Sequence, residues 1–252
     1  NKMEIQLLSL LPAMGVAAVS GLIGSFALMK KMSLAGDVIA HVALPGIGAA
    51  LLLKINPLIG AAFTLFFGAI LIWQLEKKSA LGADASIGIT FTASIALGVL
   101  LTPSEELLET LFGSFAVQSE TALLALAGTI LATGITLFLL RHRLVLSVFS
   151  PELASSAGIN VSFINLVYFL LFALSIFLGL QFLGTILVGA LIIAPAAAAR
   201  QITSSLGSFL SLSAIFGAMS VALGFLVAEK SGLALGPTIV CVAALIFFIV
   251  AV

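Results

Sequence analysis

Long apolar stretches, separated by short polar ones, recur along the whole chain of 252 residues. An α-helix needs about 20 consecutive apolar residues to cross the hydrocarbon core of a bilayer. Nine stretches approach or reach that length: residues 8–29, 38–53, 58–75, 86–102, 122–140, 163–180, 184–199, 209–228 and 236–252. The pattern predicts an all-α polytopic membrane protein, a single transmembrane domain over 1–252 with nine helices, or eight if one short segment is re-entrant.

The composition excludes several other classes of protein. Hydrophobic residues make up 62% of the chain and charged residues only 8%, whereas a soluble domain has about 25% charged residues. Ten Lys and Arg balance ten Asp and Glu, so there is no basic surface for nucleic acid. The sequence has no Gly-x-x-x-x-Gly-Lys-[Ser/Thr] phosphate loop, so any use of ATP would require another subunit.

The basic residues predict the orientation in the membrane. With the N-terminus outside, the outer connections hold three of them and the inner connections hold seven: Lys30, Lys31, Lys77, Lys78, Arg141, Arg143 and Arg200. Cytoplasmic loops carry an excess of Lys and Arg. We therefore expect the N-terminus outside and the C-terminus inside.

Two connections have a distinct character. In the outer connection 103–120, glutamates alternate with leucines, which is typical of a short amphipathic helix on the membrane surface. In the inner connection 141–162, Pro151 and Glu152 suit the first turn of a helix, and Gly158 suits a left-handed residue at its end. This short helix is either an ordinary connector or a docking element for a cytoplasmic partner.

The most informative residues are Asp37 and His41 in the second apolar stretch. They are four residues apart, so on a helix they share one face. An ionisable residue within a membrane costs about 2.5–3.5 kcal/mol on the insertion scale and marks a candidate functional site. Carboxylate oxygen and imidazole nitrogen suit a divalent metal such as manganese, zinc or iron. Alternatively, Asp37 is only a helix N-cap, and His41 is a neutral ring bonded to a neighbouring carbonyl.

Proline and glycine follow this pair directly. Pro45 and Gly46 break or kink a helix at bilayer depth, and broken helices line substrate paths in transporters. Pro195, in a later apolar stretch, either kinks its helix near a pore or is simply tolerated there. We take Pro45, Gly46 and Pro195 as candidate pore residues.

Residues 32–46, Met-Ser-Leu-Ala-Gly-Asp-Val-Ile-Ala-His-Val-Ala-Leu-Pro-Gly, resemble the signature of the zinc/manganese/iron ABC-transporter permease family. Further segments that are similar to this family follow in the same order: residues 86–89, 111–114, 152–160 and 184–196. The resemblance covers most of the chain. The first run is specific, whereas the others would be weak alone.

The resemblance implies the membrane subunit of an importer in a prokaryotic cell membrane. Two copies of this chain, forming a homodimer, would work with two ABC ATPase subunits and an extracytoplasmic metal-binding protein. Asp37 and His41 would contact the transported Mn²⁺, Zn²⁺ or Fe²⁺, and Glu152, Ala154 and Gly158 would belong to the helix that couples to the ATPase. No permanently bound cofactor and no enzymatic activity of the chain itself are expected.

Three other functions fit parts of the sequence. A permease for cobalamin, haem or ferric siderophores would share an Ala-x-x-x-Gly coupling motif, but needs a wide cavity and no Asp–His pair. A carrier driven by an ion gradient would use Asp37 and His41 as a proton relay. A membrane enzyme would need a nucleophile or several clustered ligands, and only His41 lies deep in an apolar stretch.

Overall fold

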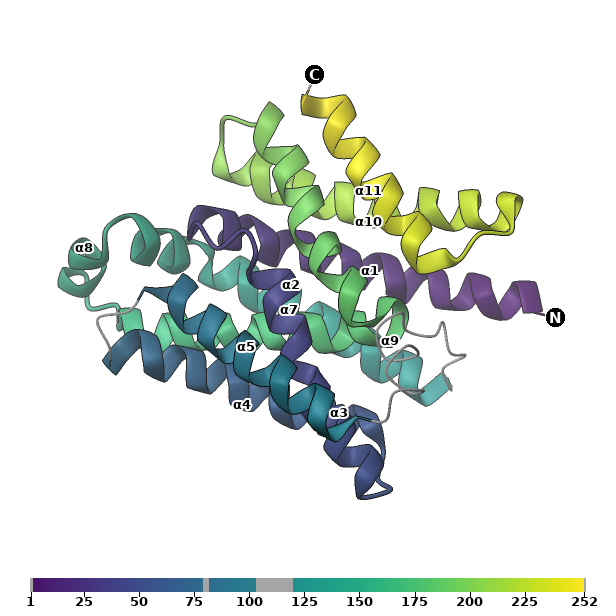
Figure 1. Cartoon of the computed structure of the whole chain (residues 1–252). Coiled ribbons are helices and arrows are strands. Elements are labelled where there is room, and N and C mark those ends of the chain that lie inside the picture. Colours follow the sequence, from purple (N-terminus) through teal and green to yellow (C-terminus); the bar gives the residue numbers. More distant parts are fainter. Residues whose placement is uncertain (1, 79–81, 103–119, 252) are drawn as a thin grey trace.

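The computed structural model describes residues 2–78, 82–102 and 120–251, and these residues are almost entirely helical (Figure 1). The elements are α1 (Lys2–Met29), α2 (Ala35–Ala40), the 3₁₀ helix η1 (His41–Ala43), α3 (Leu44–Leu52), α4 (Pro57–Lys78), α5 (Ala83–Leu101), α7 (Glu120–Phe149), α8 (Pro151–Ser156), α9 (Val161–Ile202), α10 (Leu206–Ser231) and α11 (Leu235–Ala251). The outer amphipathic helix predicted at 103–120 lies outside the described residues, apart from Glu120.

The apolar helices correspond to the predicted stretches one by one. Within the described residues, seven segments are long and apolar enough to cross a membrane: Leu10–Met29, Ala35–Leu52, Pro57–Lys78, Asp84–Leu101, Leu123–Phe149, Val161–Leu180 and Leu206–Ser231. Two shorter apolar segments, Val188–Ile202 and Leu235–Ala251, match the remaining two predictions. The prediction of an all-α polytopic membrane protein is confirmed.

The inner connection is more helical than the sequence predicts. Its first residues, 141–149, continue α7 instead of forming a loop. The Arg141 guanidinium lies 3.7 Å from the centre of the Phe138 ring, and its Nε donates to Nε2 of the exposed His142 at 3.2 Å. A helix can leave the membrane without ending when its charged side chains reach water, so the charges at 141–143 do not mark a helix end.

Helix α9 is bent, and its two arms are the predicted stretches 163–180 and 184–199. A Cβ atom on Gly179 would lie 3.0 Å from the side chain of Val188, although nine residues of straight helix rise about 13.5 Å. The chain therefore turns sharply between them. Figure 1 shows the second arm crossing the direction of the first and passing in front of α1.

Helix α1 lies at the centre of the bundle, against α7, α9 and α10. At two positions its backbone touches that of a neighbour: Gly24 faces the carbonyl of Ile192 on α9, and Gly217 of α10 faces the carbonyl of Ala17. The hydroxyls of Ser20 and the α9 residue Ser175 join by a hydrogen bond of 3.0 Å in the interior. Small residues and interhelical hydrogen bonds hold helices together in a bilayer, where apolar contact alone gives little preference for protein over lipid.

Candidate metal site and cytoplasmic coupling element

The second apolar stretch is a broken helix, α2–η1–α3, and the break falls at His41. Pro45 has no N–H group, so it cannot donate to the His41 carbonyl as a residue four positions on would do in an α-helix. That carbonyl accepts from the N–H of Leu44 instead, which is the i to i+3 bond of a 3₁₀ helix. Pro45 therefore sets the backbone geometry at the predicted metal ligand.

The His41 ring is oriented by its own helix and by α5. Its Nδ1 lies 2.8 Å from the backbone oxygen of Asp37. A carbonyl can only accept, so Nδ1 carries the proton and Nε2 keeps its unshared pair for a metal. The ring also stands edge-on to Phe91, with centroids 5.5 Å apart and planes at 86°. The bond to a neighbouring carbonyl, which the alternative interpretation of His41 expects, is present, and it does not involve Nε2.

Asp37 presents its side chain outward from the first turn of α2. The N-cap of this helix is Leu34, which makes no side-chain cap bond, so the interpretation of Asp37 as an N-cap is wrong. His41 is bonded to the main chain of Asp37 rather than to its carboxylate. The oxygen and nitrogen donors thus remain two separate groups, one helical turn apart.

Gly189, on the second arm of α9, determines how closely α2 approaches. A Cβ atom there would overlap the backbone nitrogen and Cα of Asp37, and a Cβ on Gly36 would lie 3.1 Å from the Gly189 carbonyl oxygen. The two helices meet through glycine on both sides. Gly189 is not among the predicted site residues, although it lies in the run 184–196 that carries the family resemblance. Only the tertiary contact reveals its role.

Two donors are fewer than a divalent transition metal requires. Across the described ranges, no group of three or more His, Cys, Asp or Glu side chains gathers into a possible metal site. Within these ranges, Asp37 and His41 are therefore two candidate donors without a third side chain of these types to complete a group.

Helix α8 is the short inner helix that the sequence predicts. Ala154 is fully buried, whereas Glu152 is exposed and Leu153 is 62% exposed. The helix ends at Ser156. Gly158, two residues later, has a left-handed φ of 76°, and the Ile159 N–H donates to the Ala154 carbonyl at 2.9 Å. This is a Schellman motif. It turns the chain directly into α9.

The fold and both predicted sites can be compared with known proteins. The profile of the family described as "ABC 3 transport family" matches residues 2–252. This chain belongs to the ABC 3 transport family. The predicted resemblance is confirmed, and the protein is a multi-pass membrane permease.

Named relatives of this permease handle metals. It is 37% identical over 246 residues to the manganese transport system membrane protein MntC of Listeria innocua, covering 96% of this chain and 88% of the relative. It is 28% identical over 250 residues to the high-affinity zinc uptake system membrane protein ZnuB of Haemophilus influenzae, covering 97% and 95%. The solved structure "PsaBC from Streptococcus pneumoniae in complex with Fab" matches with a TM-score of 0.81 and 33% identity, over 96% of this chain and 88% of that one.

The three candidate pore residues occupy packed positions in the permease. Pro45 lies in the first turn of α3. Gly46 is buried against the backbone of Gly60 on α4. Pro195 is buried within the second arm of α9, and the helix continues on both sides of it. Gly46 thus forms a contact between α3 and α4, and Pro45 determines the geometry of the helix break.

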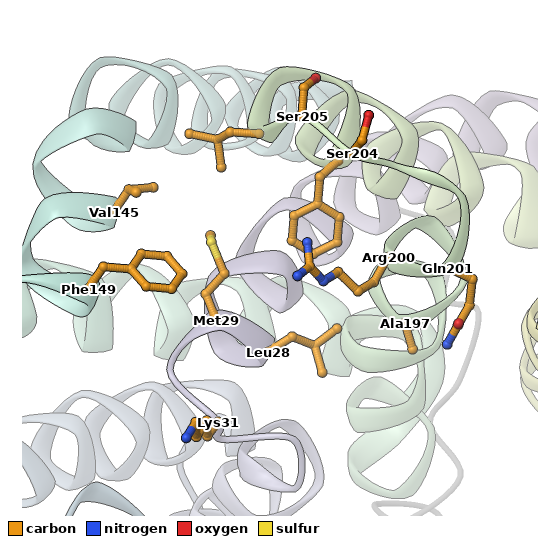
Figure 2. A pocket seen from close by; sticks show the side chains of 12 residues that line it. Leu28, Met29, Lys31, Val145, Phe149, Ala197, Arg200, Gln201, Ser204 and Ser205 are labelled. Atoms are coloured by element: carbon orange, nitrogen blue, oxygen red, sulfur yellow. The ribbon is translucent and has the colours of Figure 1, made fainter.

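A cavity of about 500 Å³ lies where α1, α7 and α9 end and α10 begins (Figure 2). Figure 2 shows the basic side chains of Lys31 and Arg200 among apolar ones, and the Arg200 guanidinium lies 5.7 Å from the centre of the Phe209 ring. Neither Asp37 nor His41 lines this cavity. The predicted metal ligands therefore form a separate site.

Proposed function

We propose that this permease is the membrane-spanning subunit of an ATP-driven importer that carries a divalent transition metal into a prokaryotic cell across its plasma membrane. The observation that carries the proposal is the Asp37–His41 pair, in which the Nδ1 hydrogen bond keeps Nε2 available. Manganese is the first candidate, because MntC is 37% identical over nearly the whole chain. Zinc is the second, because of the more distant ZnuB. Iron, which the sequence analysis included, has no support among the relatives named above.

The donor set suits a divalent transition metal. A carboxylate favours Mn²⁺ and an imidazole favours Zn²⁺ or Mn²⁺. In this proposal the metal is the cargo, and the permease holds no permanent cofactor. An extracytoplasmic metal-binding protein delivers the ion to the outer mouth.

A second copy of the permease would complete the site. Asp37 is exposed on its own chain, and symmetric homodimers repeat each surface across a twofold axis. A homodimer with α2 near that axis brings two carboxylates and two imidazoles together. The two chains together would supply four protein donors, whereas one chain supplies two.

Helix α8 would couple the permease to the ATPase subunit. Ala154 anchors the helix to the permease, while Glu152 and Leu153 face outward where a partner can receive them. Gly158 reverses the chain into α9, the helix whose second arm contacts Asp37. Closure of an ATPase dimer on α8 would therefore act on a helix that reaches the metal ligands.

Cellular metal content, measured by elemental mass spectrometry, tests the proposal. The permease is expressed with its ATPase and binding protein, as wild type and as Asp37→Asn, His41→Gln and His142→Gln at matched membrane levels. His142 is the matched control because it is the other histidine of the chain and is exposed on α7. We expect wild type and His142→Gln to raise manganese at least threefold, and the two site variants to remain at the level of cells without the permease.

Two outcomes would contradict the proposal in different ways. No rise in any divalent metal with wild type would argue for a bulky organic cargo such as cobalamin or a siderophore. A rise that Asp37→Asn and His41→Gln both retain would keep the importer, and would show that the pair only stabilises α2.

A further inference from the structure

The start of α9, the helix that follows α8 in the chain, lies beside the ends of α1 and α4. Lys30, the first residue after α1, donates from Nζ to Oδ1 of Asn165 on α9 at 2.9 Å. Trp73 of α4 donates from Nε1 to the backbone oxygen of Ser162, also on α9, at 2.8 Å. The first turns of α9 are thus held from two sides by long side chains.

The Lys30 ammonium lies in a mostly apolar setting. Its Nζ is 5.5 Å from the ring centre of Tyr168 and 5.8 Å from that of Phe169. Burial lowers the pKa of the Lys30 ammonium, and the Glu76 carboxylate of α4 raises it in part. Burying a charge costs free energy that an apolar side chain of similar length would avoid. A packing role alone therefore does not explain a lysine at this position.

The turn from Lys30 to α2 is closely bonded. The N–H of Lys30 donates to the Phe26 carbonyl, and the N–H of Met32 to the Ala27 carbonyl, each at 2.9 Å. The Ala35 N–H then donates to the Met32 carbonyl at 3.1 Å, and the Met32 side chain is 1% exposed. Hydrogen bonds and burial leave little freedom between Lys30 and Asp37, so a shift of Lys30 reaches α2.

The connection from α8 to Asn165 is equally short. Ile159 is bonded back to Ala154 of α8, and the side chain of Asn160 caps α9 by accepting from the Phe163 N–H at 3.0 Å. Asn165 follows on the next turn of the same helix. A displacement of α8 therefore moves Asn165 with it.

On the basis of the proposed function, we propose that Lys30 is a positioning residue: its hydrogen bond to Asn165 transmits the displacement of α8 to the helix that carries Asp37 and His41. Lys30 belongs neither to the Asp37–His41 pair nor to α8. It joins the end of α1, whose turn leads into α2, to the start of α9. Removing this bond is expected to leave each site intact while separating their movements.

The test is a reconstituted transporter in vesicles, with its ATPase and binding protein, in which Mn²⁺ uptake and ATP hydrolysis are measured together. Lys30→Met and Asn165→Leu each remove one side of the hydrogen bond at similar size. Coupling between two sites is worth about 5- to 150-fold, so we expect each variant to lower Mn²⁺ uptake per ATP hydrolysed about tenfold. ATP hydrolysis and Mn²⁺ binding should stay within about twofold of wild type.

Two further variants separate coupling from structure. Lys31→Met removes the same charge from the exposed neighbouring residue and is expected to behave as wild type. The double variant Lys30→Met with Asn165→Leu should be no worse than either single variant, because both remove the same interaction. Retention of wild-type uptake per ATP in Lys30→Met would overturn the inference, and so would a parallel loss of uptake, ATP hydrolysis and thermal stability.

The inference and the proposed function fail differently. If wild type takes up no divalent metal, the proposed function fails before Lys30 is considered. If wild type takes up Mn²⁺, loses it with Asp37→Asn and keeps its full coupling with Lys30→Met, only the role of Lys30 is wrong.

Discussion

Two short helices, α2 with Asp37 and α8 with Glu152 and Ala154, are packed in opposite ways. Each has six residues. In α2, four of the six are buried, including Gly36 and Ile39. In α8 only Ala154 is buried. The helix with Asp37 is held mainly by contacts within the permease, whereas α8 leaves most of its surface exposed.

Glycine serves both helices, for different reasons. Gly189 has an ordinary helical conformation, and its missing side chain lets α2 touch the backbone of α9. Gly158 has open space around it, and its left-handed φ of 76° is what requires glycine. A substitution at the first should therefore disturb packing, and one at the second should disturb only the local turn.

The largest effect is expected from Gly189→Ala. The added methyl group overlaps the backbone of Asp37, and overpacking of this kind costs about 1–3 kcal/mol. Because α2 must move away from α9, Mn²⁺ uptake in vesicles should fall more than tenfold, and the permease should unfold at a lower temperature in detergent. The single tryptophan, Trp73, reports that unfolding by fluorescence.

The matched control for this prediction is Gly128→Ala. Gly128 is a helical glycine of α7, and an added Cβ atom would meet nothing within 4 Å, so alanine should be neutral or stabilise by up to about 1 kcal/mol. If Gly189→Ala were as harmless as Gly128→Ala, the close contact between α2 and α9 would not be what positions Asp37.

The second largest effect is expected from Pro45→Ala, which alters the break within α2–η1–α3. Alanine restores an N–H that can bond to the His41 carbonyl, and residues 41–43 can then relax from 3.0 to 3.6 residues per turn. Over three residues this changes the helical rotation by about 60°, which moves the His41 ring away from Phe91. Stability should be unchanged or up to about 1 kcal/mol higher, while Mn²⁺ uptake falls about tenfold.

Pro57→Ala is the control for the proline. Pro57 is the first residue of α4, where a missing N–H costs nothing, so uptake should remain near wild type. A Pro45→Ala permease that is more stable and still fully active would show that the 3₁₀ segment has no part in placing His41.

The sequence correctly predicts those features that depend on neighbouring residues. Apolar length identified all nine stretches, and the spacing of Asp37 and His41 placed them one turn apart. The predicted start of the inner loop is wrong, because Arg141 and Arg143 lie within α7, which continues to Phe149. Charge marks the membrane boundary, and it does not mark the end of a helix.

Contacts between segments that are distant in the chain could not be predicted from the sequence. Gly189 and Asp37 belong to different helices, and only the bend of α9 brings them together. The bond between Lys30 and Asn165 spans 135 positions in the sequence. A single sequence shows that such residues are small or charged. It does not show which distant residue each of them contacts, because that depends on the tertiary packing.

The smallest effect is expected from Gly158→Ala, at the end of α8. A left-handed residue other than glycine costs about 1–2 kcal/mol, and the Schellman turn would loosen without disturbing the interior, because no atom lies within 4 Å of the added group. Affinity for the ATPase and uptake per ATP should each fall about threefold, while Mn²⁺ binding stays unchanged. Gly158→Asn should recover part of this loss, since asparagine tolerates the left-handed region.

Gly207→Ala, in the first turn of α10 with equally open surroundings, should have no effect. If Gly158→Asn were as impaired as Gly158→Ala, the side chain and not the backbone conformation would disturb docking, and the contrast with Gly189 would disappear.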